Sequence, residues 1–211
     1  MNLDRVLHLL IATRNPHKTR EFAEILGPEF AVSDLTNAGY VPVVDETGST
    51  FAENAILKAV SVSRTMPGLV VADDSGLEVA ALAGALGIFS ARYAGAAASD
   101  EENVTKLLAE MSAIDSRSAR FRCALALARE GEIITVVEGA IAGKISRARE
   151  SGKGFGYDPV FVPAGFEQTF ASLGKETKNR ISHRAKALAL LRGHLGAGVN
   201  EFGLGNESPV P

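Results

Sequence analysis

The order of apolar and polar positions along the chain predicts strands that alternate with helices. A short apolar run predicts a strand over residues 5–12. Asn15 then has the character of a helix N-cap, and Pro16 occupies the first helical position. Gly27 and Pro28 end this helix, so the chain opens with a strand that passes directly into a helix.

The next segment predicts a helix followed by a buried strand. Thr50 and Glu53 have the spacing of a capping box, and the helix should extend as far as Pro67. A continuous apolar run over residues 69–72 is typical of a buried strand. The end of that strand should present the acidic pair Asp73 and Asp74.

The middle of the chain changes from helical to strand periodicity. Ser99 and Glu102 form a second capping box, which begins a helix. Two β-rich runs, 120–125 and 133–142, are separated by residues 130–132 and predict an antiparallel hairpin.

The remaining elements complete an α/β fold with a mixed sheet flanked by helices and two lobes. We predict a strand over residues 160–162 and one last helix over residues 175–195. The chain beyond Gly193 is Gly-rich and polar. We therefore expect a single domain over residues 1–195 and a flexible tail over 196–211.

Composition narrows the functional classes. The net charge of −3 argues against a general electrostatic grip on nucleic acid, and no apolar run approaches the ~20 residues of a membrane span. The single cysteine, Cys123, lies in an alternating run and is expected to be a core residue. It forms no internal disulfide, which fits a reducing, cytoplasmic location.

The passage from the first strand to the first helix is a candidate anion site. Backbone amides and the helix dipole attract anions there, and Lys18 adds a charge. An ordinary capped helix start explains the same residues equally well. The glycine spacing of a P-loop is missing.

The acidic pair Asp73 and Asp74 is a candidate magnesium site, to which Glu46 adds another carboxylate. Adjacent acids in a turn are more often solvated or capping groups. The apolar strand that precedes this pair favours the functional interpretation, because buried carboxylates need partners.

Two later segments carry rings and cations. The loop over residues 152–158 offers Phe155 or Tyr157 for stacking on a planar base, although rings in such a loop also pack inward. The last helix carries a basic cluster, which is usually a solvated face: Lys178, Arg180, His183 and Arg184. Together with the acids and Lys18, these signals indicate a metal-bound polyphosphate that carries an aromatic base.

The ordered motifs strongly resemble those of the Ham1-like inosine and xanthosine triphosphate pyrophosphatases. The matching segments span nearly the whole chain up to about residue 195: Thr13-x-Asn15-x-x-Lys18, Glu46-Thr47-Gly48, Glu53-Asn54-Ala55, Leu57-Lys58-Ala59, Ala72-Asp73-Asp74-Ser75-Gly76-Leu77, Ser90-Ala91-Arg92-Tyr93, Gly154-Phe155-Gly156-Tyr157-Asp158 and Ile181-Ser182-His183-Arg184. Arg14 departs from a glycine that is common in the family, and Leu86 from a proline.

The resemblance implies an elongated two-lobed fold around a cleft, a homodimer, and hydrolysis of ITP, dITP and XTP to a monophosphate and pyrophosphate. It implies that Asp74 activates water and, with Glu46, binds Mg²⁺. Substrate contacts, mostly to phosphates, are implied for Thr13, Arg14, Asn15, Pro16, His17, Lys18, Ser75 and Lys178. The residues implied to hold and read the base are Phe155, Gly156, Tyr157, Asp158, His183 and Arg184.

Two alternatives remain at this point. One is a Maf-like pyrophosphatase with another base preference, which the motifs around Phe155 and His183 disfavour. The other is a nucleotide-binding module without hydrolysis, which would not need both Glu46 and Asp74.

Overall fold

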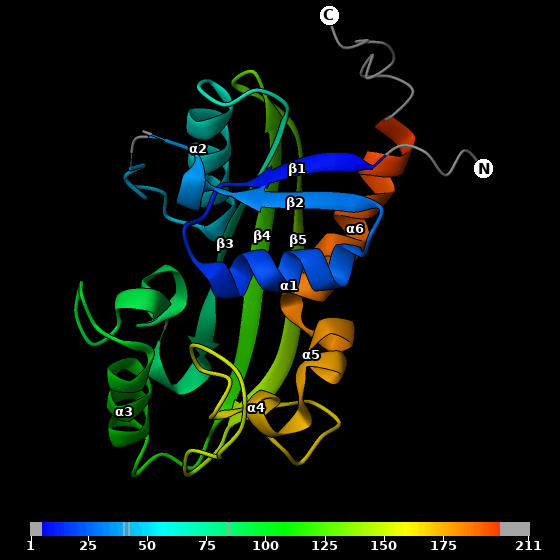
Figure 1. The fold of residues 1–211 in the computed structure, drawn as a ribbon. Helices are drawn as coiled ribbons and strands as arrows, with labels where there is room; N and C mark the ends of the chain where they lie inside the picture. The colour runs from blue at the N-terminus through cyan, green and yellow to red at the C-terminus, as the bar shows by residue number, and fades with distance from the viewer. Residues whose placement is uncertain (1–5, 40, 42, 84, 199–211) are drawn as a thin grey trace, which may run out of the picture.

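A computed structural model describes residues 6–39, 41, 43–83 and 85–198 (Figure 1). Its sheet has the order β2-β1-β3-β4-β5-β6. β1 runs parallel to β2 and β3, and all other neighbours are antiparallel, which confirms the predicted mixed sheet. The strands are β1 (Leu7–Ile11), β2 (Phe30–Asp34), β3 (Leu69–Val79), β4 (Ser118–Arg129), β5 (Glu132–Ile145) and β6 (Phe161–Pro163).

Helices flank both faces of the sheet. They are α1 (Pro16–Leu26), α2 (Phe51–Ser63), α3 (Asp100–Glu110), α4 (Phe170–Leu173), α5 (Lys175–Ile181) and α6 (His183–Gly198), with 3₁₀ turns η1 (Leu35–Asn37), η2 (Ala80–Leu82) and η3 (Gly87–Arg92). None of the helices in the described ranges is long and apolar enough to cross a membrane.

Local signals placed several elements correctly. The Asn15 side chain accepts from the His17 amide at 2.9 Å and caps α1, and the Ser99–Glu102 capping box begins α3. The predicted hairpin is β4–β5. Its turn residues Glu130 and Gly131 both have positive φ, the backbone that a tight two-residue hairpin requires.

Two sequence predictions are wrong. The strand predicted to end at residue 72 continues to Val79, because β4 pairs with β3 across the acids. The predicted last helix is two helices. Ser182 adopts extended backbone, and its hydroxyl accepts from the Ala185 amide at 3.1 Å, so it ends α5 and caps α6.

α6 continues to Gly198, so residues 196–198 of the expected tail are helical, and its remainder lies outside the described residues. The predicted start of the first strand at residue 5 also lies outside them.

The core divides into two lobes along three long strands. In one lobe, α1 and α6 pack on one face of the sheet through Phe22 and Leu188, whereas α2 packs on the other through Phe51 and Ala55. A separate cluster around Phe161 joins α3, α4 and the far ends of β3–β5. β3, β4 and β5 run through both lobes, giving the elongated shape in Figure 1.

The length of β3 creates the setting for a site. β1 pairs with β3 only up to Val71, so the edge of β3 has no strand partner from there onward on that side. The loop that leaves the carboxyl end of β1 lies beside this free edge, the place where open α/β sheets bind ligands. Successive side chains on β3 point to opposite faces, so both faces contribute groups to it.

Candidate active site

Asp73 lies on the β3 face that α1 and α6 cover, and its side chain is fully buried. Its carboxylate accepts from Lys18 Nζ, from Arg184 Nε at 3.1 Å and from the Ser75 hydroxyl at 3.0 Å. The Cys123 thiol also lies 3.1 Å away. Burial acts to raise the pKa of Asp73, but the charges of Arg184 and Lys18 outweigh it and hold the pKa well below its usual range.

Asp74 points to the opposite face, toward α2. Its Oδ1 lies 3.0 Å from Lys58 Nζ, and the same ammonium donates to Glu46 Oε1 at 2.8 Å. The Asn54 amide donates to Asp74 Oδ2 at 3.3 Å. Burial raises the pKa of Asp74, and the nearby Glu46 charge adds to this against the effect of Lys58. Burial acts to raise the pKa of Glu46 as well. The charge of Lys58 outweighs this effect, so the pKa of Glu46 is lowered.

These two carboxylates fit a divalent cation. Glu46 and Asp74 already converge on one positive charge, the Lys58 ammonium. Among the described residues, no three His, Cys, Asp or Glu side chains converge as a complete cage. A magnesium ion needs no such cage, because it keeps several waters and takes one or two carboxylates together with substrate phosphates.

The side chains of the predicted anion loop contact different parts of the structure. Lys18 reaches Asp73, whereas the Arg14 guanidinium donates to the Val41 carbonyl at 2.9 Å. The His17 ring stacks on Phe155 with centroids 5.3 Å apart. The Thr13 hydroxyl accepts from the Asn15 amide at 3.1 Å and shapes the turn before α1. Of these side chains, Lys18 reaches the acids.

The loop with Phe155 is closed by its own acid. Asp158 is buried and accepts from the Phe155 amide at 3.0 Å and from Lys178 Nζ at 2.5 Å. The Tyr157 hydroxyl donates to the Ser90 carbonyl at 2.7 Å, so this ring packs inward against η3. Gly156 donates its amide to Asp100 at 2.6 Å. Phe155 is therefore the ring of this loop that is placed to stack on a ligand.

The basic cluster of α5 and α6 is mostly buried, so it is no solvated face. Lys178, His183 and Arg184 are buried, whereas Arg180 is exposed. His183 stacks on Phe121 at 4.7 Å, and its Nδ1 is buried without a hydrogen-bond partner in the described part of the chain. Burial, with the charges of Arg184 and Lys178, lowers the pKa of His183 well below its usual range, so the imidazole is neutral.

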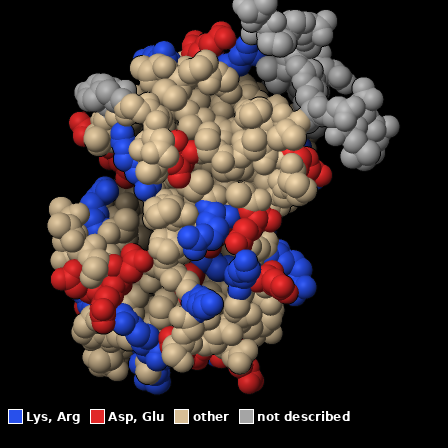
Figure 2. Space-filling view, in the orientation of Figure 1, with Lys and Arg blue, Asp and Glu red and all other residues tan. Residues whose placement is uncertain are grey.

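One cavity of about 130 Å³ brings the predicted residues together. Its lining includes Asn15, Lys18, Ser75, Phe155, Gly156, Tyr157, Asp158, Lys178, His183 and Arg184. Thr13, Arg14, Pro16 and His17 do not line it. The predicted metal carboxylates Glu46 and Asp74 do not line it either, and they meet at Lys58 on the α2 side of β3. Figure 2 shows the furrow between the part that carries α3 and the main body, with basic side chains gathered over α1 and α5.

The model of the Ham1 family matches residues 9–194. The chain belongs to the Ham1 family. It is 47% identical over 186 residues to the dITP/XTP pyrophosphatase of Bacillus licheniformis, covering 87% of this chain and 95% of that protein. The B. subtilis dITP/XTP pyrophosphatase is 46% identical, covering 86% and 93%.

Solved Ham1 structures share the fold. The Staphylococcus aureus Ham1 protein superposes with a TM-score of 0.79 at 40% identity, covering 90% of this chain and 98% of that chain. A Coxiella burnetii HAM1 protein gives 0.80 at 40% identity, covering 90% and 99%.

Sequence reasoning missed four members of this Ham1 site. Glu21 binds Lys178 at 2.6 Å and pairs with Arg184, and Arg92 lies 3.5 Å from Glu46. Lys58 and Asn54 contact Asp74 as described. Glu21 lies three residues after Lys18, one helical turn along the same face of α1. That spacing is the signal from which Glu21 was predictable.

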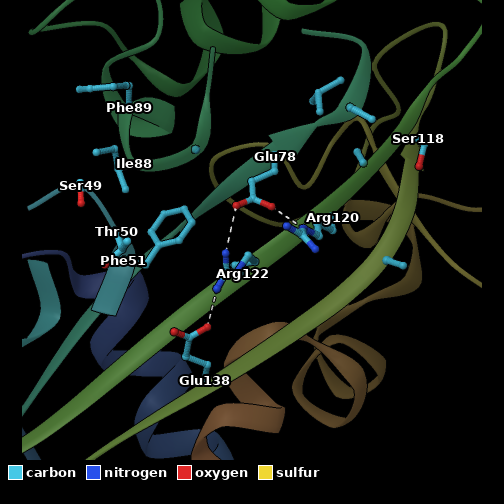
Figure 3. Close-up of a pocket in the computed structure, with 15 residues that line it drawn as sticks. Ser49, Thr50, Phe51, Glu78, Ile88, Phe89, Ser118, Arg120, Arg122 and Glu138 are labelled. Carbon is cyan, nitrogen blue, oxygen red and sulfur yellow. Dashed lines mark hydrogen bonds and ion pairs between the residues drawn. The ribbon is translucent and has the colours of Figure 1, made fainter. Parts of the chain in front are cut away.

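A second, larger hollow of about 810 Å³ lies on the α2 side of the sheet, between the start of α2 and η3 (Figure 3). Four charged side chains of β3, β4 and β5 form a continuous chain of ion pairs on its floor: Arg120, Glu78, Arg122 and Glu138. The Phe51 ring points into it, and Phe89, which is 49% exposed, lies at its rim. No active-site carboxylate lines this groove.

Proposed function

We propose that this Ham1 protein hydrolyses the non-canonical purine triphosphates dITP, ITP and XTP to the nucleoside monophosphate and pyrophosphate. The carrying observation is the convergence of Glu46 and Asp74 on one positive charge at the free edge of β3, beside Lys18. The names of the Bacillus relatives support the substrate class.

Glu46 and Asp74 are proposed to hold Mg²⁺, displacing the Lys58 ammonium that now bridges them. When bound there, the ion supplies charge neutralisation on the phosphates and orients them for attack at the α–β linkage. Arg92, which lies 3.5 Å from Glu46, adds positive charge at the same place.

Asp74 is proposed to accept the proton of the attacking water. A base works best when its pKa approaches the working pH, and burial raises the pKa of Asp74 in that direction. Asn54 holds Oδ2, which fixes the carboxylate orientation. Asp73 is unsuited to this role, because Arg184 and Lys18 donate to its carboxylate and lower its pKa, which makes it a weak base.

Lys18 and Lys178 are proposed to bind the phosphates, with the amides at the start of α1. Both ammonium groups are now paired with acids, namely Asp73 for Lys18, and Asp158 and Glu21 for Lys178. Separating these buried pairs would leave uncompensated carboxylates, so each ammonium is proposed to keep its acid and to contact the polyphosphate with its remaining N–H donors.

The base is proposed to stack on Phe155 and to be read by His183 and Arg184. The 6-oxo group of hypoxanthine and xanthine accepts hydrogen bonds, whereas the 6-amine of adenine donates them. Buried donors lose a partner when adenine binds, which is costly. The Gly156 amide already serves Asp100, so the unpartnered His183 Nδ1 and a spare Arg184 N–H are the better candidates.

The test is a panel of canonical and non-canonical triphosphates with Mg²⁺, in which pyrophosphate and orthophosphate are measured separately. We expect pyrophosphate as the product and a strong preference for dITP and XTP over ATP. Equal rates on ATP and ITP would refute the substrate assignment. Tight binding without any turnover would favour a binding module instead.

We also propose a homodimer that meets at the groove in Figure 3. A twofold interface brings the same face of two copies together. The exposed Phe89 at the rim would supply apolar contact there, beside the charged Arg120 and Arg122. The double variant R120E/R122E should sediment as a monomer where the wild type sediments as a dimer. An unchanged sedimentation coefficient would exclude this face.

A cytoplasmic location is part of the proposal. The buried thiol of Cys123 is free, as in proteins of reducing compartments. Fractionation of cells that express the full chain tests it, and recovery of the protein with the membrane fraction would contradict it.

A further inference from the structure

Phe155 is the wall between two cavities. One is the active-site cavity that contains Arg184 and His183. The other, of about 500 Å³, lies between α1, the loop before Phe155 and α5, and it is lined by His17 and Arg20 but by neither of those two residues. Phe155 and Lys178 line both cavities. The position of the Phe155 ring therefore affects the shape of the active-site cavity on the side that borders the second cavity.

His17 supports that ring from the second cavity. The imidazole lies nearly parallel to Phe155, with 16° between the ring planes and 5.3 Å between the centroids. The main chain of His17 is fixed as well, because its amide donates to the Asn15 side chain that caps α1. Lys18, the next residue, turns the other way to Asp73. The first turn of α1 thus sends one side chain to the phosphate side and the other to the aromatic ring.

We propose that His17 is a positioning residue for substrate, which holds Phe155 as the stacking shelf for the base, and that it makes no phosphate contact. The inference rests on the proposed function. The Phe155 ring also carries the Lys178 ammonium at 4.4 Å and the Arg184 guanidinium at 5.9 Å, both cations of the active site. A shift of the Phe155 ring would disturb its contacts with both cations. His17 therefore matters for base binding although it is exposed at the surface.

The test separates aromatic stacking by residue 17 from a cationic contact at the same position. His17→Phe keeps a ring for stacking without a cation, whereas His17→Lys keeps a cation without a ring. Arg20→Ala is the matched control, because Arg20 lines the same cavity and lies on the same helix but is assigned no role in the site. For each variant, kcat and KM for dITP and the inhibition constant of inorganic pyrophosphate are measured.

His17→Ala is expected to raise the KM for dITP about three- to tenfold, the range of one lost aromatic stack, with kcat and pyrophosphate inhibition within about twofold of wild type. His17→Phe should restore the wild-type KM, and His17→Lys should not.

Three results would overturn the proposal. Rescue by lysine but not by phenylalanine would make His17 a phosphate ligand. A lower KM in His17→Ala would mean that the imidazole blocks the shelf, and an unchanged KM would mean that Phe155 needs no support. Wild-type protein without dITP hydrolysis would instead refute the proposed function, so the two failures are distinguishable.

Discussion

Asp73→Asn removes one charge from the most enclosed ion pair of the structure while keeping the shape of the side chain. Asp73 is fully buried, and the Arg184 side chain is 2% exposed. Lys18 is 20% exposed and regains water when its partner is neutral. Arg184 cannot, so after the substitution it keeps Glu21 as its single remaining carboxylate. The loss in the free energy of unfolding should therefore come mainly from the buried Arg184 guanidinium, which has lost one of its two carboxylate partners.

Breaking a buried pair by removing one partner costs about 3–5 kcal/mol, and we expect a value near 3 because Glu21 remains. Urea unfolding of wild type and Asp73→Asn, with unchanged m-values, measures this difference. The control is Asp115→Asn, whose pair with Arg147 is solvent-exposed on both sides and whose loss should cost about 1 kcal/mol or less. A loss for Asp73→Asn no larger than that for Asp115→Asn would refute the reasoning.

Three further predictions follow from neighbouring contacts. Lys58→Met removes the cation between Glu46 and Asp74. Mn²⁺ should therefore bind the nucleotide-free variant about tenfold or more tightly than wild type, as measured by titration calorimetry. Weaker binding would contradict a metal site shared by these two carboxylates. Gly76→Ala places a methyl group 2.4 Å from the Gly87 carbonyl oxygen. This overpacking should cost about 1–3 kcal/mol and lower the midpoint of thermal unfolding by several degrees. An unchanged midpoint would mean that η3 can move away from the methyl group. The lowered pKa of His183 means that the unfolded chain binds one more proton below about pH 6.5. Stability should therefore fall with acidification from there by up to about 1.4 kcal/mol per pH unit, and His183→Gln should remove this slope, whereas an identical slope would show that His183 is not the group.

Local chemistry made much of the fold predictable. Helix starts are encoded within four residues, as at Asn15 and Ser99, and the β4–β5 hairpin within its turn. The break at Ser182 was not predicted, although a serine before His183 is an adequate N-cap, because the apolar spacing continues across it.

The site was harder to predict where partners lie far apart in the chain. The acids of β3 were placed in a turn because nothing nearby neutralises them. The cations that pair with Asp73 come from 55 residues before it, at Lys18, and 111 residues after it, at Arg184. The cation that pairs with Asp74, Lys58, comes from 16 residues before it. Likewise, Glu21 is separated from Arg184 by 163 residues, so no local pattern shows that the basic cluster of α5 and α6 is buried against acids. The carboxylate pair Glu46 and Asp74 was predictable through the resemblance, but Lys58 as their shared partner was not.

The central claim is that Asp74 and Glu46 support hydrolysis of a purine triphosphate at the free edge of β3. The most direct measurement is single-turnover conversion of dITP with Mg²⁺ by wild type and Asp74→Asn, with dIMP and pyrophosphate quantified together and circular dichroism as the folding control. The account predicts equal amounts of dIMP and pyrophosphate from wild type, and a loss of at least about a hundredfold in rate for the folded Asp74→Asn variant. Orthophosphate as the first product, or near-normal turnover by Asp74→Asn, would contradict it.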